Sequence, residues 1–227
     1  MESSIMLFDL LTLADSNLPA GGYAFSSGLE SAFHMGLLRT SSDLESYLHS
    51  TLYTTAQSEL PFINACFNGD PIPSDVTDLL TTYDAMLTAP AIARASAVQG
   101  RNLLRIMFEL YPSDAMNNLR TTLLKQPVPA HHTIVFGTTF RIAEFTPDHT
   151  VQIFMYQFLR DQVSAAVRLG QIGPLEAARL QKRHHTTATE AITSVADLPY
   201  TYATRSAPQW DIAQSMHEHL YSRLFQS

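Results

Sequence analysis

Apolar residues recur along most of the chain at the spacing that is typical of amphipathic α-helices. In the stretch 26–36, for example, Leu29, Ala32 and Phe33 fall on one helical face. Segments rich in Pro, Gly and Asn interrupt the pattern and mark loops between successive helices. The pattern predicts helices over residues 5–14, 26–36, 44–53, 58–68, 74–88, 90–111, 113–125, 148–170 and 211–227, and one more that begins at 174.

Local signals support several of these boundaries. Ser42 and Glu45 have the spacing of a capping box, which predicts that a helix begins there. Pro90 suits the first turn of the next long helix, because an N–H at that position would have no partner within the helix. Pro112 ends that helix, and Pro174 opens a later one.

The stretch 133–145 is rich in β-branched and aromatic residues, so its propensity also allows a β-strand. Because the chain holds no second convincing strand to pair with it, we predict a helix here as well. A length of 227 residues suits one domain. The sequence therefore predicts an all-α fold, a single-domain helical bundle of roughly eight to ten helices.

The stretch 148–170 is the most apolar of the predicted helices. Seven of the nine residues from Val151 to Leu159 are apolar, and a helix that is apolar all round is normally buried on all sides. We expect this helix at the centre of the bundle or in the seam of a homodimer. Tyr156 and Phe158 are the candidate seam residues, with burial in a monomeric core as the alternative.

The C-terminal residues form a separate predicted unit. The irregular stretch 197–210 divides a bundle over residues 1–210 from a helical docking segment over 211–227. The docking segment carries one apolar stripe, which predicts packing on the bundle or on a partner, and it could fold only on binding. The stripe consists of Ile212, Met216, Leu220 and Leu224.

Composition narrows the function classes. A formal net charge of −7 argues against non-specific binding to nucleic acid, which requires a basic surface. Charged residues make up 15% of the chain, against about 25% in ordinary domains, which indicates a surface covered by a partner or else a large core. The single cysteine, Cys66, excludes an internal disulfide and fits a reducing compartment, where it would be a small buried side chain.

No targeting or membrane segment is apparent. No basic region precedes an apolar run near residue 1, and no stretch approaches the ~18 apolar residues that cross a membrane. We therefore expect a cytoplasmic protein without membrane contact.

Motifs for common enzyme chemistry are absent from the sequence. Neither Lys125 nor Lys182 lies in a glycine-rich turn, so there is no P-loop, and there is no GxSxG or HExxH. The nine histidines include the pairs 131–132 and 184–185, but none has the i,i+4 spacing that places two imidazoles on one helical face. We expect no catalytic site and no metal site, with histidines that are solvated or that cap helices.

Three arginines share a predicted helical face. Arg94, Arg101 and Arg105 differ by seven and four positions. This face could dock an acidic partner, or its arginines could pair with local carboxylates. An arginine supplied to a GTPase is a third interpretation, because such a residue stabilises charge in the transition state.

Four sequence blocks carry a resemblance. They are LLTLADSNLPAGGYAFSSGLE over residues 10–30, RASAVQGRNLL over 94–104, AAVRLGQIGPLEAARL over 165–180 and DIAQSMHEHLYSRLFQS over 211–227. In this order, and over nearly the whole chain, they resemble the UreF family of urease accessory proteins. The third block departs from the family pattern, since PLEAAR stands where bacterial members usually have a glutamine-rich turn.

The resemblance implies an all-helical homodimer in a cytoplasmic complex with the accessory protein UreD, also called UreH, and the GTPase UreG. That complex delivers nickel to apo-urease, so nickel is handled by the complex and the chain itself has no cofactor. The resemblance further implies that the chain modulates the UreG GTPase and is not an enzyme. The alternatives are a helical carrier of a small apolar molecule and a helical enzyme with an unrecognised site.

The same blocks supply the candidate partner-binding residues. Tyr23 follows the Gly-Gly turn and would contact a partner or pack in the core. Ser26 would cap the helix that carries Glu30, and Glu30 would pair across an interface or be solvated. We expect the segment 211–227 to dock UreD. The full set is Tyr23, Ser26, Glu30, Arg94, Arg101, His217, Glu218, Tyr221, Ser222, Arg223 and Phe225.

Overall fold

The computed structural model describes residues 2–19, 25–68, 76–205, 212–213, 215–216 and 224–225, with only the backbone for 2–6. Over these residues the chain forms nine α-helices and no strand, which confirms the predicted all-α class. The helices are α1 (Glu2–Leu13), α2 (Leu29–His34), α3 (Ser41–Ala65), α4 (Val76–Met86), α5 (Pro90–Leu110), α6 (Asp114–Leu124), α7 (His132–Ile142), α8 (Pro147–Arg168) and α9 (Pro174–Ser194), followed by the 3₁₀ turn η2 (Tyr200–Tyr202).

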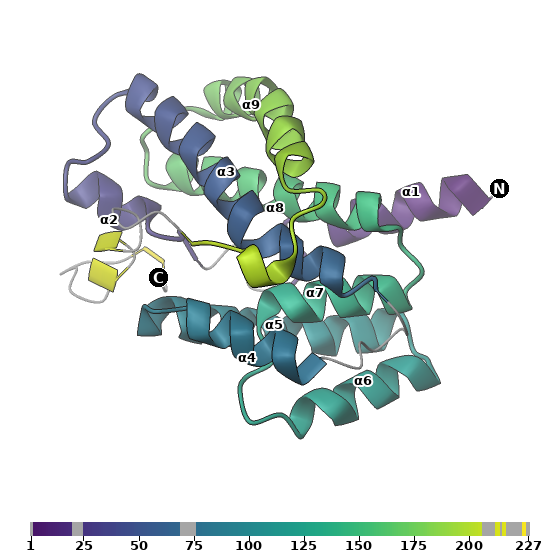
Figure 1. Ribbon diagram of the computed structural model, residues 1–227. Helices are drawn as coiled ribbons and strands as arrows, with labels where there is room; N and C mark the ends of the chain where they lie inside the picture. The colour runs from purple at the N-terminus through teal and green to yellow at the C-terminus, as the bar shows by residue number, and fades with distance from the viewer. Residues whose placement is uncertain are drawn as a thin grey trace.

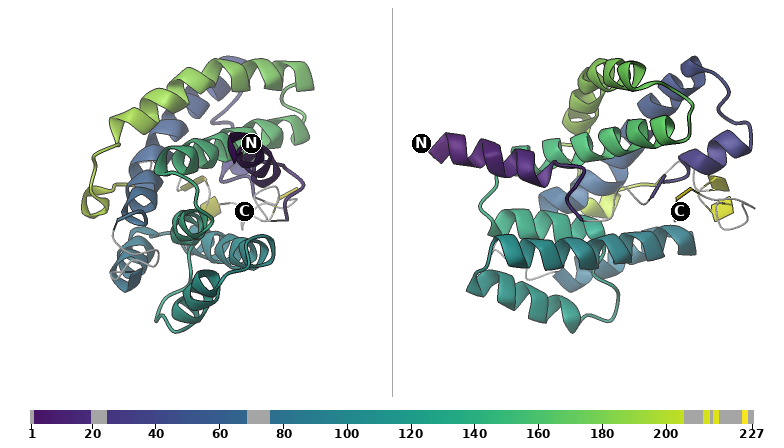
Figure 2. Two further views of the ribbon diagram at one scale, coloured as in Figure 1. Left: turned by 90° about the vertical axis from the view of Figure 1, so that its right-hand side faces the viewer. Right: turned by 180° about the vertical axis from the view of Figure 1, so that it is seen from behind.

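The long helix α3 is the centre of the arrangement. It packs against α8 and α9 on one side and against α7 on the other, and α5 and α6 pack against α7 in turn (Figure 1). Its leucines Leu48, Leu52 and Leu60 are fully buried. By contrast, the N-terminal end of α1 extends beyond the other helices, as the right-hand view of Figure 2 shows. No described helix combines the length and the hydropathy that crossing a bilayer requires.

Helix α3 corrects two expectations. The stretches 44–53 and 58–68 were predicted as separate helices, but α3 continues through Pro61 to Ala65. Its capping box consists of Thr40 and Asp43 rather than Ser42 and Glu45: the Asp43 amide donates to Thr40 Oγ1 at 3.1 Å, and the Thr40 amide donates to Asp43 Oδ2 at 2.9 Å. The earlier pair prevails because Thr40 has the extended backbone that a cap requires.

Two glycines set the distances between helices. A Cβ on Gly100 of α5 would lie 2.1 Å from the Ala130 carbonyl oxygen, just before α7. A Cβ on Gly137 of α7 would lie 2.9 Å from Sγ of Cys66, which is fully buried as predicted. The close approach of α5 to the start of α7 therefore explains why a glycine stands at position 100 in the QGR sequence.

Helix α8 is less enclosed than its composition predicted. Phe154, Met155 and Leu159 are buried, but Tyr156 is 39% exposed. Within the single chain the burial of α8 is therefore incomplete, and the role of Tyr156 in a dimer seam stays a prediction. One face of α8 is left open because α1, which lies beside it, covers only part of it: Leu10, Leu11 and Ala14 line a shallow apolar groove together with Ile153 and Tyr156.

Candidate partner-docking site

The S-x-GLE end of the first sequence block is held in place by α3 and α8. The Gln162 amide of α8 donates to the Ser26 carbonyl at 3.4 Å, and the Tyr47 hydroxyl of α3 donates to Gln162 Oε1 at 2.8 Å. The N-cap of α2 is Gly28, with φ of 90°, and not Ser26 as expected. Ser26 nevertheless supports the first turn, because its buried hydroxyl accepts the Glu30 N–H at 3.4 Å.

Glu30 lies directly against residues 224 and 225, close to the C-terminus. Its side chain is only 2% exposed, and its carboxylate accepts the backbone N–H of Leu224 at 2.7 Å and that of Phe225 at 3.3 Å. Phe225 is buried, and the Arg168 guanidinium at the end of α8 lies 4.1 Å from its ring centroid. The first and fourth sequence blocks therefore meet on one surface, although they lie at opposite ends of the sequence.

The apolar stripe predicted for the C-terminal segment does not pack on the bundle in the described residues. Ile212 is 57% exposed, and Met216 and Leu224 are exposed as well. The buried residues are instead Ala213 and Phe225, each one position further along the chain. Three residues of the stripe are therefore open to a partner, and the fourth, Leu220, lies outside the described residues.

The remaining docking candidates divide into two groups. Arg94, Arg101 and Arg105 are all exposed on α5, as their spacing predicted. The others lie outside the described residues: Tyr23, His217, Glu218, Tyr221, Ser222 and Arg223.

The two candidate dimer residues lie on different sides of α8. Tyr156 faces the groove beside α1, whereas the half-buried Phe158 lines a cavity inside the molecule. Residues two apart on a helix point about 200° apart, so the two side chains cannot share one flat surface. Helix α1 adds the exposed side chains of Leu7, Phe8 and Leu11; Leu11 lines the same groove as Tyr156, and Phe8 is 66% exposed.

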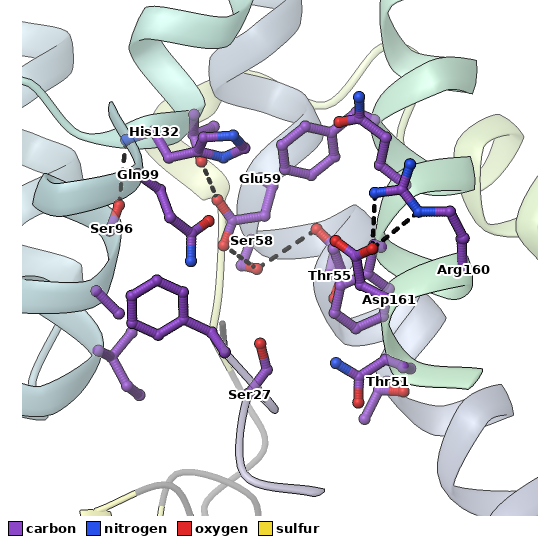
Figure 3. A pocket seen from close by; sticks show the side chains of 18 of the residues that line it. Ser27, Thr51, Thr55, Ser58, Glu59, Ser96, Gln99, His132, Arg160 and Asp161 are labelled. Carbon is purple, nitrogen blue, oxygen red and sulfur yellow. Dashed lines mark hydrogen bonds and ion pairs between the residues drawn. The ribbon is translucent and has the colours of Figure 1, made fainter. Parts of the chain in front are cut away.

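A cavity of about 210 Å³ lies between α3, α5, α7 and α8. Its lining is rich in hydroxyl and amide groups, several of which are labelled in Figure 3, including Thr55, Ser58, Ser96 and Gln99. Sequence reasoning missed this cavity, because its polar residues come from five helices and from connecting segments such as those at Ser27 and Arg205, and no local motif connects them.

Glu59 is the most enclosed acid of the cavity. It accepts hydrogen bonds from Tyr83 Oη at 2.6 Å, from Thr133 Oγ1 at 2.5 Å and from Ser58 Oγ at 3.0 Å, and Arg205 Nη1 lies 3.5 Å from its carboxylate. Burial beside this carboxylate raises the pKa of Tyr83 well above its ordinary value. Because Glu59 already has three hydroxyl donors and an arginine, its role is to hold α3, α4, α7 and the chain after η2 together.

Two further titratable groups line the cavity. Burial lowers the pKa of His132 to about 4, and its ring packs against Phe136 and Phe154. Burial raises the pKa of Asp161, which Arg160 opposes from an ion pair at 2.6 Å. The described residues contain no group of three or more His, Cys, Asp or Glu side chains that could hold a metal ion.

The expectation of solvated or capping histidines is wrong for His132 and for two more. His131 is fully buried, and its Nε2 lies 2.8 Å from Asp84 Oδ1. His184 is buried in α9, with its ring nitrogens facing the carbonyls of Leu180 and Glu45. Both histidines connect helices, a role that the spacing of neighbouring residues cannot reveal.

Comparison with known proteins identifies the relatives of this chain. The sequence profile of the UreF family matches residues 38–185. Urease accessory protein F of Oryza sativa subsp. indica is 34% identical over 215 residues, which cover 94% of this chain and 82% of the rice protein. The protein of the same name from Arabidopsis thaliana is 31% identical over 227 residues, 98% and 93% of the two chains. Urease accessory protein UreF of Mycobacterium marinum is 32% identical over 193 residues, 83% and 87% of the two chains.

The family profile includes the second and third sequence blocks, and the rice and Arabidopsis matches cover nearly the whole chain. The chain therefore belongs to the UreF family.

Proposed function

We propose that this chain is a urease accessory protein that acts as a docking scaffold in urease maturation. Its relatives in plants and mycobacteria are named urease accessory proteins, which supports a role in maturation without catalysis of its own. In finer detail, the chain binds UreD and UreG, supports nickel insertion into apo-urease and modulates the UreG GTPase.

One observation carries the docking proposal: the first and last sequence blocks form a single surface around Glu30, Arg168 and Phe225. Exposed apolar side chains at Ile212, Met216 and Leu224 lie in the C-terminal segment that ends at this surface. Exposed apolar groups beside buried anchor residues are typical of a surface that binds a protein partner. We assign the docking of UreD to the segment 211–227.

The exposed arginines of α5 are proposed as a second contact. The chain is acidic overall, with a net charge of −7, so a row of three arginines on one helix is a local exception that suits an acidic protein surface. Arg101→Glu is expected to weaken co-purification with UreG, whereas Arg179→Glu, an equal change at an exposed position of α9, should have no effect.

The homodimer is proposed to form through α1 and the Tyr156 side of α8. This region combines the exposed side chains of Leu7, Phe8 and Leu11 with an apolar groove. Since Phe158 faces the inner cavity, it would support this interface only indirectly.

The test of the proposed function is co-expression of the chain with UreD and UreG, followed by affinity purification and a urease assay with and without the chain. Co-elution of the three proteins, together with loss of nickel-dependent urease activity on deletion of the chain, is the expected result. Unchanged urease activity and no co-elution would refute the proposal.

A further inference from the structure

The Glu30 carboxylate binds the main chain of the C-terminal end and not one of its side chains. One carboxylate oxygen accepts the Leu224 N–H at 2.7 Å and the other accepts the Phe225 N–H at 3.3 Å. Hydrogen bonds from amides to an ionised carboxylate are stronger than those between neutral groups. A carboxylate that accepts two successive amides fixes both the position and the direction of that piece of chain.

The Phe225 side chain supplies a second, independent contact. Its ring is buried, and the Arg168 guanidinium lies 4.1 Å from its centroid. A guanidinium over an aromatic face gives a favourable cation–π contact, more so where water is excluded. Arg168 also stands in the last turn of α8, where the helix dipole favours a positive charge. The seat for residues 224–225 is therefore built from the side chains of two helices that pack on each other.

The chain is anchored a second time before the C-terminal segment begins. Thr204 donates its backbone N–H to the Gln57 carbonyl at 3.3 Å, and Arg205 pairs with the buried Glu59. Both anchors place a buried carboxylate of the helical body against the C-terminal part of the chain. The chain is thus attached to the body at residues 204–205, ahead of the segment proposed for docking, and again at residues 224–225 within it.

We propose that Glu30 is a positioning residue for partner binding: its carboxylate, assisted by Arg168, clasps the main chain at Leu224 and Phe225 and so fixes the C-terminal segment in the form that the partner binds. This inference rests on the proposed function in one respect, the use of the segment for docking. Glu30 itself, at 2% exposure, does not touch the partner. It acts through the two amides that it holds.

The experiment uses the full chain and three variants. Glu30→Gln keeps the length of the side chain and removes its charge and one of its two acceptors. Phe225→Ala keeps both amides and removes the ring. It tests the same contact between residues 224–225 and the helices if Glu30→Gln does not fold. Glu109→Gln removes the same charge from an exposed position of α5 and is the matched control. Thermal unfolding by circular dichroism establishes that each variant is folded.

Two measurements are made on each protein: hydrogen exchange at the Leu224 and Phe225 amides by NMR without any partner, and co-purification with UreD. We expect Glu30→Gln and Phe225→Ala to speed up exchange at these amides about tenfold or more, and to reduce co-purification. Glu109→Gln should change neither.

The outcomes separate the clasp from the docking role. Unchanged amide exchange in a folded Glu30→Gln variant would refute the statement that the Glu30 carboxylate holds residues 224 and 225 in place. Faster exchange with undiminished co-purification would show that Glu30 holds the Leu224 and Phe225 amides but does not position the segment for its partner. If the unmodified chain itself does not co-purify with UreD, the proposed function fails, and the exchange data still decide the clasp.

Discussion

The Gln57 carbonyl in the middle of α3 accepts a hydrogen bond from the Thr204 backbone N–H at 3.3 Å. Residue 61, four positions after Gln57, is a proline and has no N–H to donate to that carbonyl. The proline therefore makes a helical acceptor accessible to a distant part of the chain. Arg205 follows directly and pairs with Glu59 at 3.5 Å, so the interrupted turn of α3 is where the chain after η2 attaches.

Replacing Pro61 with alanine tests this relationship. The new N–H would compete with Thr204 for the Gln57 carbonyl, and alanine favours a helix interior over proline by about 3 kcal/mol. Some of this gain is offset, because Pro61 is buried and restricts the unfolded chain. We expect the free energy of unfolding to rise by about 1 kcal/mol and the Thr204 amide to exchange faster. Urea denaturation and NMR hydrogen exchange measure the two effects; an unchanged Thr204 amide would contradict the explanation.

Gly100→Ala should destabilise the protein. The added Cβ would lie 2.1 Å from the Ala130 carbonyl oxygen, which belongs to the backbone and cannot rotate away. Forced separation of α5 and α7 should lower the free energy of unfolding by about 2–3 kcal/mol in urea denaturation. Gly173→Ser is the control, since Gly173 is the N-cap of α9 with open space around it, and serine is a preferred cap. A control loss as large as that of Gly100→Ala would refute this account.

The ion pair of Arg205 with Glu59 should contribute measurably to stability. Arg205→Gln leaves the buried Glu59 charge with only its three hydroxyl donors, so we expect a loss of about 1–3 kcal/mol in urea denaturation. The matched control is Arg183→Gln, which removes the exposed ion pair with Glu45 and should cost at most about 0.5 kcal/mol. Equal effects of the two changes would show that the buried pair has no special role.

His132 makes stability depend on pH. Its pKa is lowered to about 4 by burial, whereas the unfolded chain has the ordinary histidine value of about 6.5. Between these values the unfolded state binds more protons than the folded state, so stability is full above pH ~6.5 and falls as the pH drops toward ~4. The contribution is at most about 3 kcal/mol.

The measurement is the free energy of unfolding of the parent and of His132→Gln at several pH values. The raised pKa of Asp161 acts in the opposite direction, because that group contributes stability at low pH that is lost as the pH rises. The difference between parent and variant removes this contribution. A difference that stays constant from pH 7 to pH 4 would refute the role of His132.

The proposed dimer predicts that a charge at Tyr156 or Phe8 disrupts self-association. Tyr156→Asp and Phe8→Glu place a carboxylate in an apolar contact, and either should shift the protein from dimer to monomer in light scattering. Leu175→Glu, an equal change at an exposed leucine of α9, should not. Variants that remain dimeric would exclude this face as the interface.

Sequence reasoning succeeded where a local signal decides the structure. Pro90 begins α5 and Pro174 begins α9, because these effects depend on backbone chemistry within one turn. It failed between residues 53 and 58, where the pattern predicted two separate helices and α3 is continuous. The helix does not end there, because Leu52, Ala56 and Leu60 are fully buried against its neighbours.

Glu30 and Glu59 illustrate the other type of failure. Both would be solvated on an isolated helix, and nothing within four residues of either one predicts burial. Apart from Ser58 beside Glu59, the donors to their carboxylates come from far along the chain: Leu224 and Phe225 for Glu30, and Tyr83, Thr133 and Arg205 for Glu59.

The sequence by itself determined the helical class, most helix ends and the family, because periodicity, prolines and the four blocks are properties of neighbouring residues. Only the tertiary structure decided which polar groups are buried, where the cavity lies and that the two ends of the chain share one surface. The physical reason is that burying a polar or charged group requires a hydrogen-bond partner. For Glu30, Glu59 and His131 those partners come from other elements of the fold, and only folding brings them together.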